Sequence, residues 1–320
     1  MKFLPWLFCL VVASPAFAQD AYPNKPVKIL VPYGPGGATD IIARIVAVRL
    51  SESLGQSFVV ENRPGANGNL ALEAAAKAPA DGYTLLVGNV STNAINESMY
   101  AASLSIRPSR DLAAITKLVE VPHIVVANAS FPANSIAELV ALAKKEPGRI
   151  NYTSAGIGSY PHLDMERFLR ASGTQMTHVP YKGGAGQAIP AMVAGEVQLA
   201  FFNMASLLPH IKSGRLKALA AIPTQRIPEL PSVPTLTEQG FPGIGTNAWQ
   251  GMFAPAATPK PVVDKLYASV SAVLAKEKAG LAEKMMAVEV SPSPAQFAEE
   301  VRRDAQSWGD FLREAKLKVE

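Results

Sequence analysis

Cysteine is almost missing from this chain of 320 residues, which contains only Cys9. A single cysteine excludes a disulfide framework and every zinc site built from cysteine pairs. Histidine is also scarce, with four residues, so the sequence offers little for a histidine-rich metal site. We therefore expect no metal and no other cofactor, and a fold that is held together by its apolar core.

Charged residues are few as well. Asp, Glu, Lys and Arg make up 18% of the chain, below the about 25% of typical soluble domains. The 30 basic and 26 acidic residues leave a net charge of only +4. Nucleic-acid binders concentrate Lys and Arg on one face, whereas the only adjacent basic pairs here are Lys144-Lys145 and Arg302-Arg303. Nucleic acid is therefore not expected as a partner.

Long apolar runs are missing too, because no segment reaches the roughly 20 residues that span a bilayer. Residues 1–18, MKFLPWLFCLVVASPAFA, instead combine Lys2, a short apolar region and an Ala-x-Ala cleavage site. They predict a Sec signal peptide cleaved after Ala18, since there is no twin arginine and Phe8 before the cysteine disfavours a lipoprotein. The mature chain would then be periplasmic, with a net charge of +3 and no cysteine.

The mature sequence alternates strands and helices. In its first part, apolar strands are predicted at 27–33, 58–61 and 83–88, separated by a helix at 41–54 and an Ala-rich helix at 70–78. Gly55 is expected to end the first helix in a left-handed conformation, and Asn69 to cap the second. Strand, helix, strand, helix, strand predicts an α/β fold with a parallel sheet covered by helices.

The same alternation returns further along the chain. Strands are predicted at 124–127, 150–153, 197–202 and 217–222, with helices between them. A Pro- and Gly-rich segment, 223–260, follows as a connection back to the first lobe. Two C-terminal helices close the sequence, the second opened by a capping box at its start.

We therefore predict two α/β lobes in series. The first lobe is discontinuous and consists of residues 19–122 and 223–320, and the second consists of residues 123–222. Ligands of open α/β sheets bind beyond the carboxyl ends of the strands, at helix N-termini.

Each predicted lobe has one glycine-containing loop between a strand and a helix, Gly34–Asp40 and Ser154–Ser159. Glycines let backbone N–H groups approach an anion closely, and Thr39 offers a hydroxyl that is expected to cap its helix. Two such helix ends facing each other could hold both ends of a small dicarboxylate without Lys or Arg. Ordinary tight turns remain the alternative for both loops.

Catalytic motifs are missing from the chain: there is no G-x-S-x-G, H-E-x-x-H, P-loop or S-x-x-K. Only Ser154 or Ser159 with His162 could form a nucleophile and base, as in a periplasmic hydrolase-like enzyme on a two-lobed scaffold. A lone histidine such as His162 more often packs than faces a cleft. Lys182 could reach a carboxylate or be solvated, and His123 is interpreted as structural.

Seven stretches, in this order and spacing, resemble the tripartite tricarboxylate transporter substrate-binding proteins, the TctC or Bug family of bacterial periplasmic receptors. They are YPNKPVKILVPYGPGGATDIIAR (22–44), VVENRPGANGN (59–69), DGYTLLVGNVSTNAIN (81–96), INYTSAGIGSYPHL (150–163), HVPYKGG (178–184), GEVQLAFFN (195–203) and LPHIKSGRLKALA (208–220). The resemblance extends into the C-terminal part, and so covers essentially the whole mature chain.

The resemblance implies a type II periplasmic-binding-protein fold, in which two α/β lobes close around a ligand by bending at crossing hinge strands. It implies a receptor, expected to be a monomer and not an enzyme, that delivers a small di-, tri- or aromatic carboxylate to membrane transporter subunits. The candidate ligand-binding residues are Tyr33, Gly34, Gly36, Gly37, Ala38, Thr39, Asp40, Ser91, Thr92, Ser154, Ala155, Gly156, Gly158, Ser159, His162 and Asn203.

Two positions depart from the family pattern. Many members have acidic residues where this chain has Gln198 and Phe202. If Phe202 borders the pocket, the far end of the ligand is apolar or aromatic; if it does not, Phe202 belongs to the core, which is the commoner position for phenylalanine.

Overall fold

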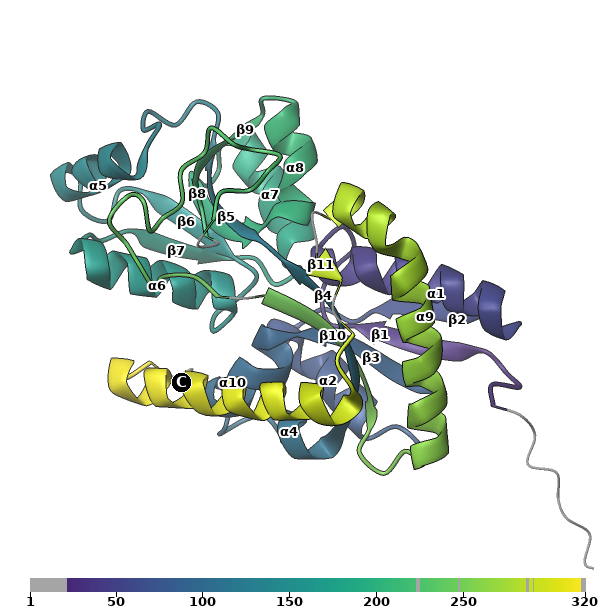
Figure 1. Cartoon of the computed structure of the whole chain (residues 1–320). Helices are drawn as coiled ribbons and strands as arrows, with labels where there is room; N and C mark the ends of the chain where they lie inside the picture. The colour runs from purple at the N-terminus through teal and green to yellow at the C-terminus, as the bar shows by residue number, and fades with distance from the viewer. Residues whose placement is uncertain (1–21, 223–224, 247, 286–287, 290, 318–320) are drawn as a thin grey trace, which may run out of the picture.

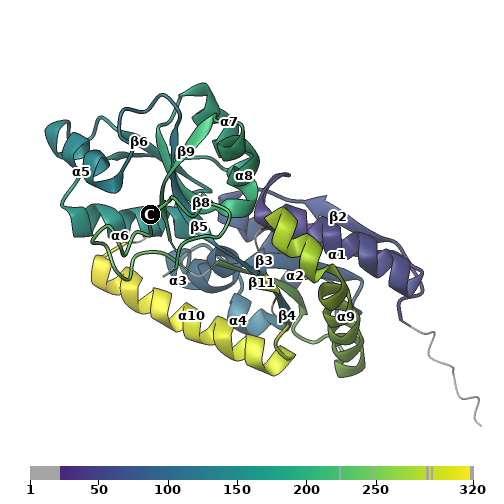
Figure 2. The same cartoon turned by 45° about the horizontal axis from the view of Figure 1, so that its top comes forward.

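The computed structural model describes residues 22–222, 225–246, 248–285, 288–289 and 291–317. Two lobes lie side by side, each built around one β-sheet with helices on its faces (Figures 1 and 2). The predicted signal peptide, residues 1–18, lies outside the described residues. None of the helices in the described part is long and apolar enough to cross a membrane.

The first lobe contains a six-stranded sheet with the order β11-β4-β10-β3-β1-β2. Its strands are β1 (Val27–Val31), β2 (Phe58–Asn62), β3 (Thr84–Asn89), β4 (Leu112–Val121), β10 (Ala248–Pro255) and β11 (Val288–Glu289). The parallel pairing that the sequence predicts is present between β1 and its neighbours β2 and β3. The sheet as a whole is mixed, because β10 returns from the other lobe and runs antiparallel to β3 and β4.

Helices cover both faces of this sheet. They are α1 (Ala38–Leu54), α2 (Asn69–Ala76), α3 (Asn96–Met99), α4 (Pro108–Asp111), α9 (Lys260–Met285) and α10 (Pro294–Ala315), with the short turns η1 (Ala66–Gly68) and η2 (Ser91–Ile95). One apolar core joins α1 and α9 to the sheet, and a second joins α2 and α10 to its other face. Trp308 of α10 belongs to the second core.

The second lobe contains a five-stranded sheet with the order β7-β6-β8-β5-β9. Its elements are β5 (His123–Asn128), α5 (Ile136–Lys145), β6 (Asn151–Ser154), α6 (Tyr160–Ser172), β7 (Thr177–Pro180), α7 (Ala185–Ala194), β8 (Leu199–Asn203), α8 (Met204–Lys212) and β9 (Leu216–Ala221). Strands β6, β7 and β8 are parallel, whereas β5 is antiparallel to β8 and β9. The helices again bury one apolar core on each face.

The chain crosses between the lobes twice. The first crossing is at Pro122, between β4 and β5, and the second lies between β9 and β10. The segment 225–246 does not return directly to the first lobe as expected, because its apolar side chains, among them Leu236 and Phe241, pack into a core of the second lobe. Ala221 also forms a β-bridge with Thr235. We therefore propose that the second lobe extends from residue 123 to about residue 246 instead of ending at 222.

Several helix ends follow the sequence pattern. Gly55 ends α1 in a left-handed conformation, and Ser293 forms the capping box that opens α10. The prediction that Thr39 caps α1 is wrong. Gly37 holds the N-cap position without a side-chain bond, and the Thr39 hydroxyl instead donates to Gln250. Asn69 likewise lies inside α2 and does not cap it.

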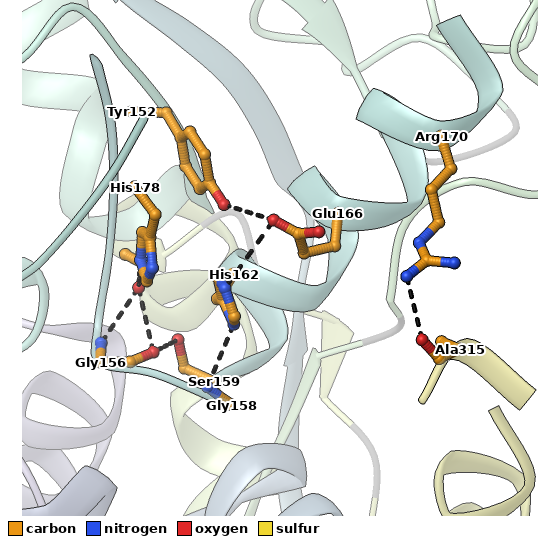
Figure 3. A network of polar contacts seen from close by, with 10 residues as sticks. Tyr152, Gly156, Gly158, Ser159, His162, Glu166, Arg170, His178 and Ala315 are labelled. Atoms are coloured by element: carbon orange, nitrogen blue, oxygen red, sulfur yellow. Dashed lines mark hydrogen bonds and ion pairs between the residues drawn. The ribbon is translucent and has the colours of Figure 1, made fainter. Parts of the chain in front are cut away.

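Helix α6 of the second lobe lies along the C-terminal half of α10 of the first lobe (Figures 1 and 2). The Arg167 guanidinium carbon is 4.2 Å from the ring centroids of both Trp308 and Phe311. A turn further along α6, Arg170 Nη2 donates a hydrogen bond of 3.0 Å to the carbonyl of Ala315 (Figure 3). These contacts join the two lobes, so they stabilise the closed arrangement.

The variant Arg167→Met is expected to weaken ligand binding roughly fivefold, because a cation–π contact contributes about 1 kcal/mol to the closed state. Methionine keeps an apolar side chain against the two rings but loses the charge. Small-angle scattering of the unliganded protein should show a larger radius of gyration than the wild type. The control is Arg302→Met, which removes an exposed arginine of α10 that pairs with Glu299 of the same helix. Equal radii and affinities for both variants would contradict the role of the α6–α10 contact.

Candidate functional site

A small cavity lies between the lobes, beyond the carboxyl ends of β1, β3, β6 and β8. It is lined by Tyr33, Gly37, Ala38, Thr39, Asn89, Ser91, Ala155, Tyr160, Ala185, Phe202, Asn203 and Gln250. Its volume of about 30 Å³ leaves room for roughly one or two waters. The lobes are therefore closed on each other, and any ligand with several heavy atoms needs them to separate before it can enter.

Two helix N-termini border the cavity. Gly37, Ala38 and Thr39 bring the first turn of α1 to its wall, and Ala185 brings the first residue of α7. The first N–H groups of a helix have no intrahelical acceptor, and the helix dipole adds a partial positive charge there. Neither N-terminus has a side-chain cap, so both can bind an anion.

The wall formed by the first lobe is a continuous network of buried polar side chains. Asn89, the last residue of β3, accepts hydrogen bonds through Oδ1 from the Ser91 N–H (2.9 Å) and the Tyr33 hydroxyl (3.4 Å). Its amide nitrogen donates to Thr39 Oγ1 (3.4 Å), and Thr39 in turn donates to Gln250 Oε1 (2.6 Å). Residues 250 and 89 lie opposite each other on adjacent antiparallel strands, which explains why this glutamine reaches the site.

The wall formed by the second lobe is more apolar. It consists of Ala155, Ala185 and Phe202 together with the polar side chains of Tyr160 and Asn203. Asn203 caps α8 by accepting the N–H of Ser206 at 3.0 Å through its Oδ1 atom. The cavity thus has a polar wall in one lobe and a mainly apolar wall in the other.

No formal charge stands on the cavity wall, since the described residues that line it include no Lys, Arg, His, Asp or Glu. The two tyrosines stay neutral, because burial raises the pKa values of both Tyr33 and Tyr160 well above the ordinary value. Neutral hydroxyls, amide N–H groups and helix ends can all donate hydrogen bonds, so the wall can bind an anionic guest.

The structure brings some of the sequence-predicted residues to the cavity and leaves others outside it. Those at the wall are Tyr33, Gly37, Ala38, Thr39, Ser91, Ala155 and Asn203. Those not among the lining residues are Gly34, Gly36, Asp40, Thr92, Ser154, Gly156, Gly158, Ser159 and His162. Lys182, whose role the sequence left open, is exposed and also does not line the cavity.

In the first lobe, Asp40 serves to fix the loop. Its carboxylate accepts hydrogen bonds from the N–H of Gly36 and from the side chains of Arg44 and Asn62. Burial alone would raise the pKa of Asp40, but these hydrogen bonds hold it below its ordinary value. Gly34 contacts the other lobe directly, since its N–H donates to the carbonyl of Gly183 at 3.2 Å.

In the second lobe, the predicted loop is occupied by its own side chains (Figure 3). Ser154 Oγ accepts the Gly156 N–H at 3.1 Å and lies 2.7 Å from His178 Nε2. His162 Nδ1 accepts the N–H of Gly158 at 3.1 Å. The two histidine rings stack with centroids 4.1 Å apart, so His162 packs and holds the loop instead of facing the cleft.

The first N–H group of α6 is also bonded within the protein, in this case to a side chain of the opposite lobe. The Tyr160 N–H, at the start of the helix, donates to Ser91 Oγ at 2.9 Å. The next residue, Pro161, has no N–H to offer. The predicted pair of facing helix ends is therefore formed by α1 and α7 in this closed state, and not by α1 and α6.

Four wall residues were missed by sequence reasoning: Asn89, Tyr160, Ala185 and Gln250. Asn89 has a recognisable signal, because it is the polar residue that ends the third strand. Tyr160 and Ala185 are the first residues of helices, which the search for glycine loops passed over. No sequence pattern around Gln250 indicates that this residue reaches the cavity. Phe202, left open between core and pocket, does border the cavity while only 1% exposed.

Two α/β lobes, joined by crossing segments and closed over a polar cavity at their helix ends, define a two-lobed periplasmic solute-binding protein. The family model for the tripartite tricarboxylate transporter family receptor matches residues 42–316, and the chain belongs to this family. Members of the family are periplasmic solute-binding receptors and not enzymes, so the fold and the class expected from the sequence are confirmed.

Known relatives resemble the chain over nearly its full length. Protein BugT of Bordetella pertussis is 35% identical, covering 96% of this chain and 94% of BugT. The solved structure of Rhodopseudomonas palustris Rpa4515 with adipate has a TM-score of 0.88 and 33% identity, covering 93% of this chain and 99% of the other. That of MatC from the same species, with bound malate, has a TM-score of 0.84 and 31% identity, covering 90% and 99%.

Proposed function

We propose that this receptor captures a small organic carboxylate between its lobes and delivers it to the membrane subunits of a tripartite tricarboxylate-type transporter. The cavity carries the proposal, because its polar wall consists of hydrogen-bond donors and two free helix N-termini with no charged side chain among the described lining residues. A carboxylate accepts several such donors at once. The adipate of Rpa4515 and the malate of MatC support the same ligand class.

A ligand screen tests this function directly. Thermal unfolding of the mature protein should be measured with mono-, di-, tri- and aromatic carboxylates, with calorimetry for each hit. A ligand present at 100 times its Kd should stabilise the folded protein by about 2.7 kcal/mol. Phosphate, sulfate and neutral sugars serve as controls that should have no effect. If every carboxylate class left the unfolding temperature unchanged, the proposed function would be wrong.

Binding and release are proposed to proceed by hinge motion. The cavity of about 30 Å³ cannot admit a multi-atom carboxylate in the closed state. Rotation at Pro122 and at the second crossing would open the cleft, and the ligand would then be enclosed as the lobes close. The transporter would recognise the closed form, in which surfaces of both lobes have a fixed relation.

The remaining parts of the proposal concern location, assembly and chemistry. We propose a periplasmic monomer exported by a signal peptide cleaved after Ala18, without catalytic activity. The hydrolase-like alternative is not favoured by the geometry. Ser154 and Ser159 are fully buried and do not line the cavity, and His162 Nδ1 accepts the N–H of Gly158, so neither serine could attack a bound substrate with His162 as its base.

A further inference from the structure

Between β2 and α2 the chain turns through four consecutive residues with positive φ, namely Gly65, Ala66, Asn67 and Gly68. Two of them carry side chains in the left-handed region that favours glycine, Ala66 with φ of 46° and Asn67 with φ of 51°. A backbone conformation of this kind persists only where the surrounding structure holds it. Ala66 is exposed, whereas Asn67 is only 5% exposed, so the turn places one amide side chain in the interior.

Only the nitrogen of the buried Asn67 amide is hydrogen-bonded. Asn96 Nδ2 donates to the backbone carbonyl of Asn67 at 2.9 Å and to Asn69 Oδ1 at 2.6 Å, so the other amide atom of Asn96 is an acceptor oxygen. Asn67 Nδ2 donates to that oxygen at 2.9 Å. Asn67 Oδ1 is therefore the atom left over, and it is buried without a hydrogen-bond partner among the described residues.

The opposite lobe covers this oxygen. A Cβ atom built on Gly156, in the loop before α6, would lie 3.5 Å from Asn67 Oδ1 and 3.7 Å from Asn67 Cβ, so the two residues face each other across the boundary between the lobes. The N–H of Gly156 does not serve the oxygen, because it donates to Ser154 Oγ at 3.1 Å. In the closed arrangement an acceptor of the first lobe thus lies against a backbone that gives it no donor.

We propose that Asn67 opposes lobe closure and thereby keeps the unliganded receptor open. The inference rests on the proposed function and deepens it by naming a residue that regulates the same site. When the lobes separate, Gly156 moves away with the second lobe and water can hydrate the Asn67 oxygen. Closure removes this hydration and supplies no donor, which costs free energy that the bound ligand has to offset. Asn67 therefore lowers the affinity but reserves the closed form for the liganded receptor.

The variant Asn67→Gly tests the inference, because glycine adopts the left-handed conformation readily and has no amide oxygen. Asn67 is not among the residues that line the cavity, so the substitution removes no contact with a ligand there. We expect the best carboxylate from the screen to bind about fivefold more tightly or better, as measured by calorimetry. Small-angle scattering of the unliganded variant should give a smaller radius of gyration than the wild type.

Ala66→Gly is the matched control, since it relieves the same backbone strain at the neighbouring residue without removing an amide oxygen. We expect it to keep the Kd and the radius of the wild type. Unchanged or weaker binding in Asn67→Gly, or an equal gain in both variants, would overturn the inference and leave the receptor function standing. A radius of the unliganded wild type that already equals the radius of the closed structure would overturn it as well.

Asn67→Asp provides a second test, with the opposite expected sign. Aspartate tolerates the left-handed conformation as asparagine does, but closure would then bury a negative charge without a donor, which costs more than burying a neutral oxygen. At pH 7.5 we expect the affinity to fall about tenfold or more and the unliganded radius to increase. Wild-type values in a folded Asn67→Asp would contradict the inference. Scattering needs no ligand, so the radii decide the inference even if no carboxylate binds and the proposed function fails.

Discussion

The variant Gly186→Ala is expected to lose carboxylate binding by about 100-fold or more while its helix becomes more stable. A Cβ atom on Gly186, in the first turn of α7, would lie 2.2 Å from the carbonyl oxygen of Pro35 in the other lobe. Both groups belong to the backbone or are fixed to it, so neither can move aside and the lobes must separate. The apparent affinity of a receptor falls in proportion to the population of its closed state, so 100-fold corresponds to about 2.7 kcal/mol.

The substitution separates closure from folding. Alanine is favoured over glycine in a helix by about 1 kcal/mol, so the unliganded variant should unfold at a temperature no lower than the wild type. Calorimetry with the best carboxylate from the screen measures the affinity, and small-angle scattering measures the opening. Gly280→Ala in α9 is the matched control, since its new methyl group would meet only a flexible Glu277 side-chain oxygen at 3.5 Å. Wild-type affinity in Gly186→Ala would show that closure does not bring these two segments together.

The second large effect is a loss of folding stability at acidic pH. Burial lowers the pKa of His123 from 6.5 to about 3, so the folded protein keeps this ring neutral while the unfolded chain takes up a proton below pH 6.5. The stability that this histidine contributes is therefore fully present above pH 6.5 and is lost as the pH falls toward 3. Between pH 7.5 and pH 5 the loss amounts to about 2 kcal/mol of unfolding free energy.

Comparison with His123→Phe isolates this contribution. Phenylalanine cannot titrate, and it can keep the stacking that His123 makes on the Tyr160 ring, whose centroid is 4.4 Å away. Denaturant unfolding at pH 7.5 and pH 5 should show a drop in stability that is about 2 kcal/mol smaller in the variant than in the wild type. An equal drop in both proteins would show that His123 does not contribute to the loss of stability at acidic pH.

Other buried groups act in the wild type and the variant alike, so they cancel in this comparison. Burial and the neighbouring His162 lower the pKa of His178 to about 3, which acts in the same direction as His123. Asp164 acts in the opposite direction. Its burial raises the pKa to about 6 despite hydrogen bonds from Thr246, so protonation of Asp164 favours the folded state as the pH falls through 6.

Much of the fold could be predicted from the sequence because its signals are local. The apolar strands and amphipathic helices of both lobes follow from periodicity, and Gly55 and Ser293 mark helix ends by their own conformational preferences. The path of the connecting segment was not predicted, because it depends on packing between residues far apart in the sequence. The Pro-rich segment 225–246 carries apolar residues at irregular spacing, and only the assembled sheet shows that they fill a core of the second lobe.

Of the two loops of the candidate site, one could be predicted from local sequence and the other could not. The loop before α1 was found from the sequence because glycines between a strand and a helix are a local requirement for close anion approach. The loop 154–159 has the same local pattern but a different outcome, since His162, His178 and Ser91 occupy its donors from positions that no spacing rule connects.

By itself, the sequence determined the export signal as a prediction, the two α/β lobes, the family and the glycine loop 34–40 before the first helix. Only the tertiary structure decided which donors stay free for a ligand. Gln250 reaches the Thr39 hydroxyl, from which it accepts a hydrogen bond, because an antiparallel strand returns from far along the chain and places residue 250 opposite Asn89. Hydrogen-bond satisfaction depends on every group within reach, so a donor's availability becomes defined only when both lobes are folded and closed.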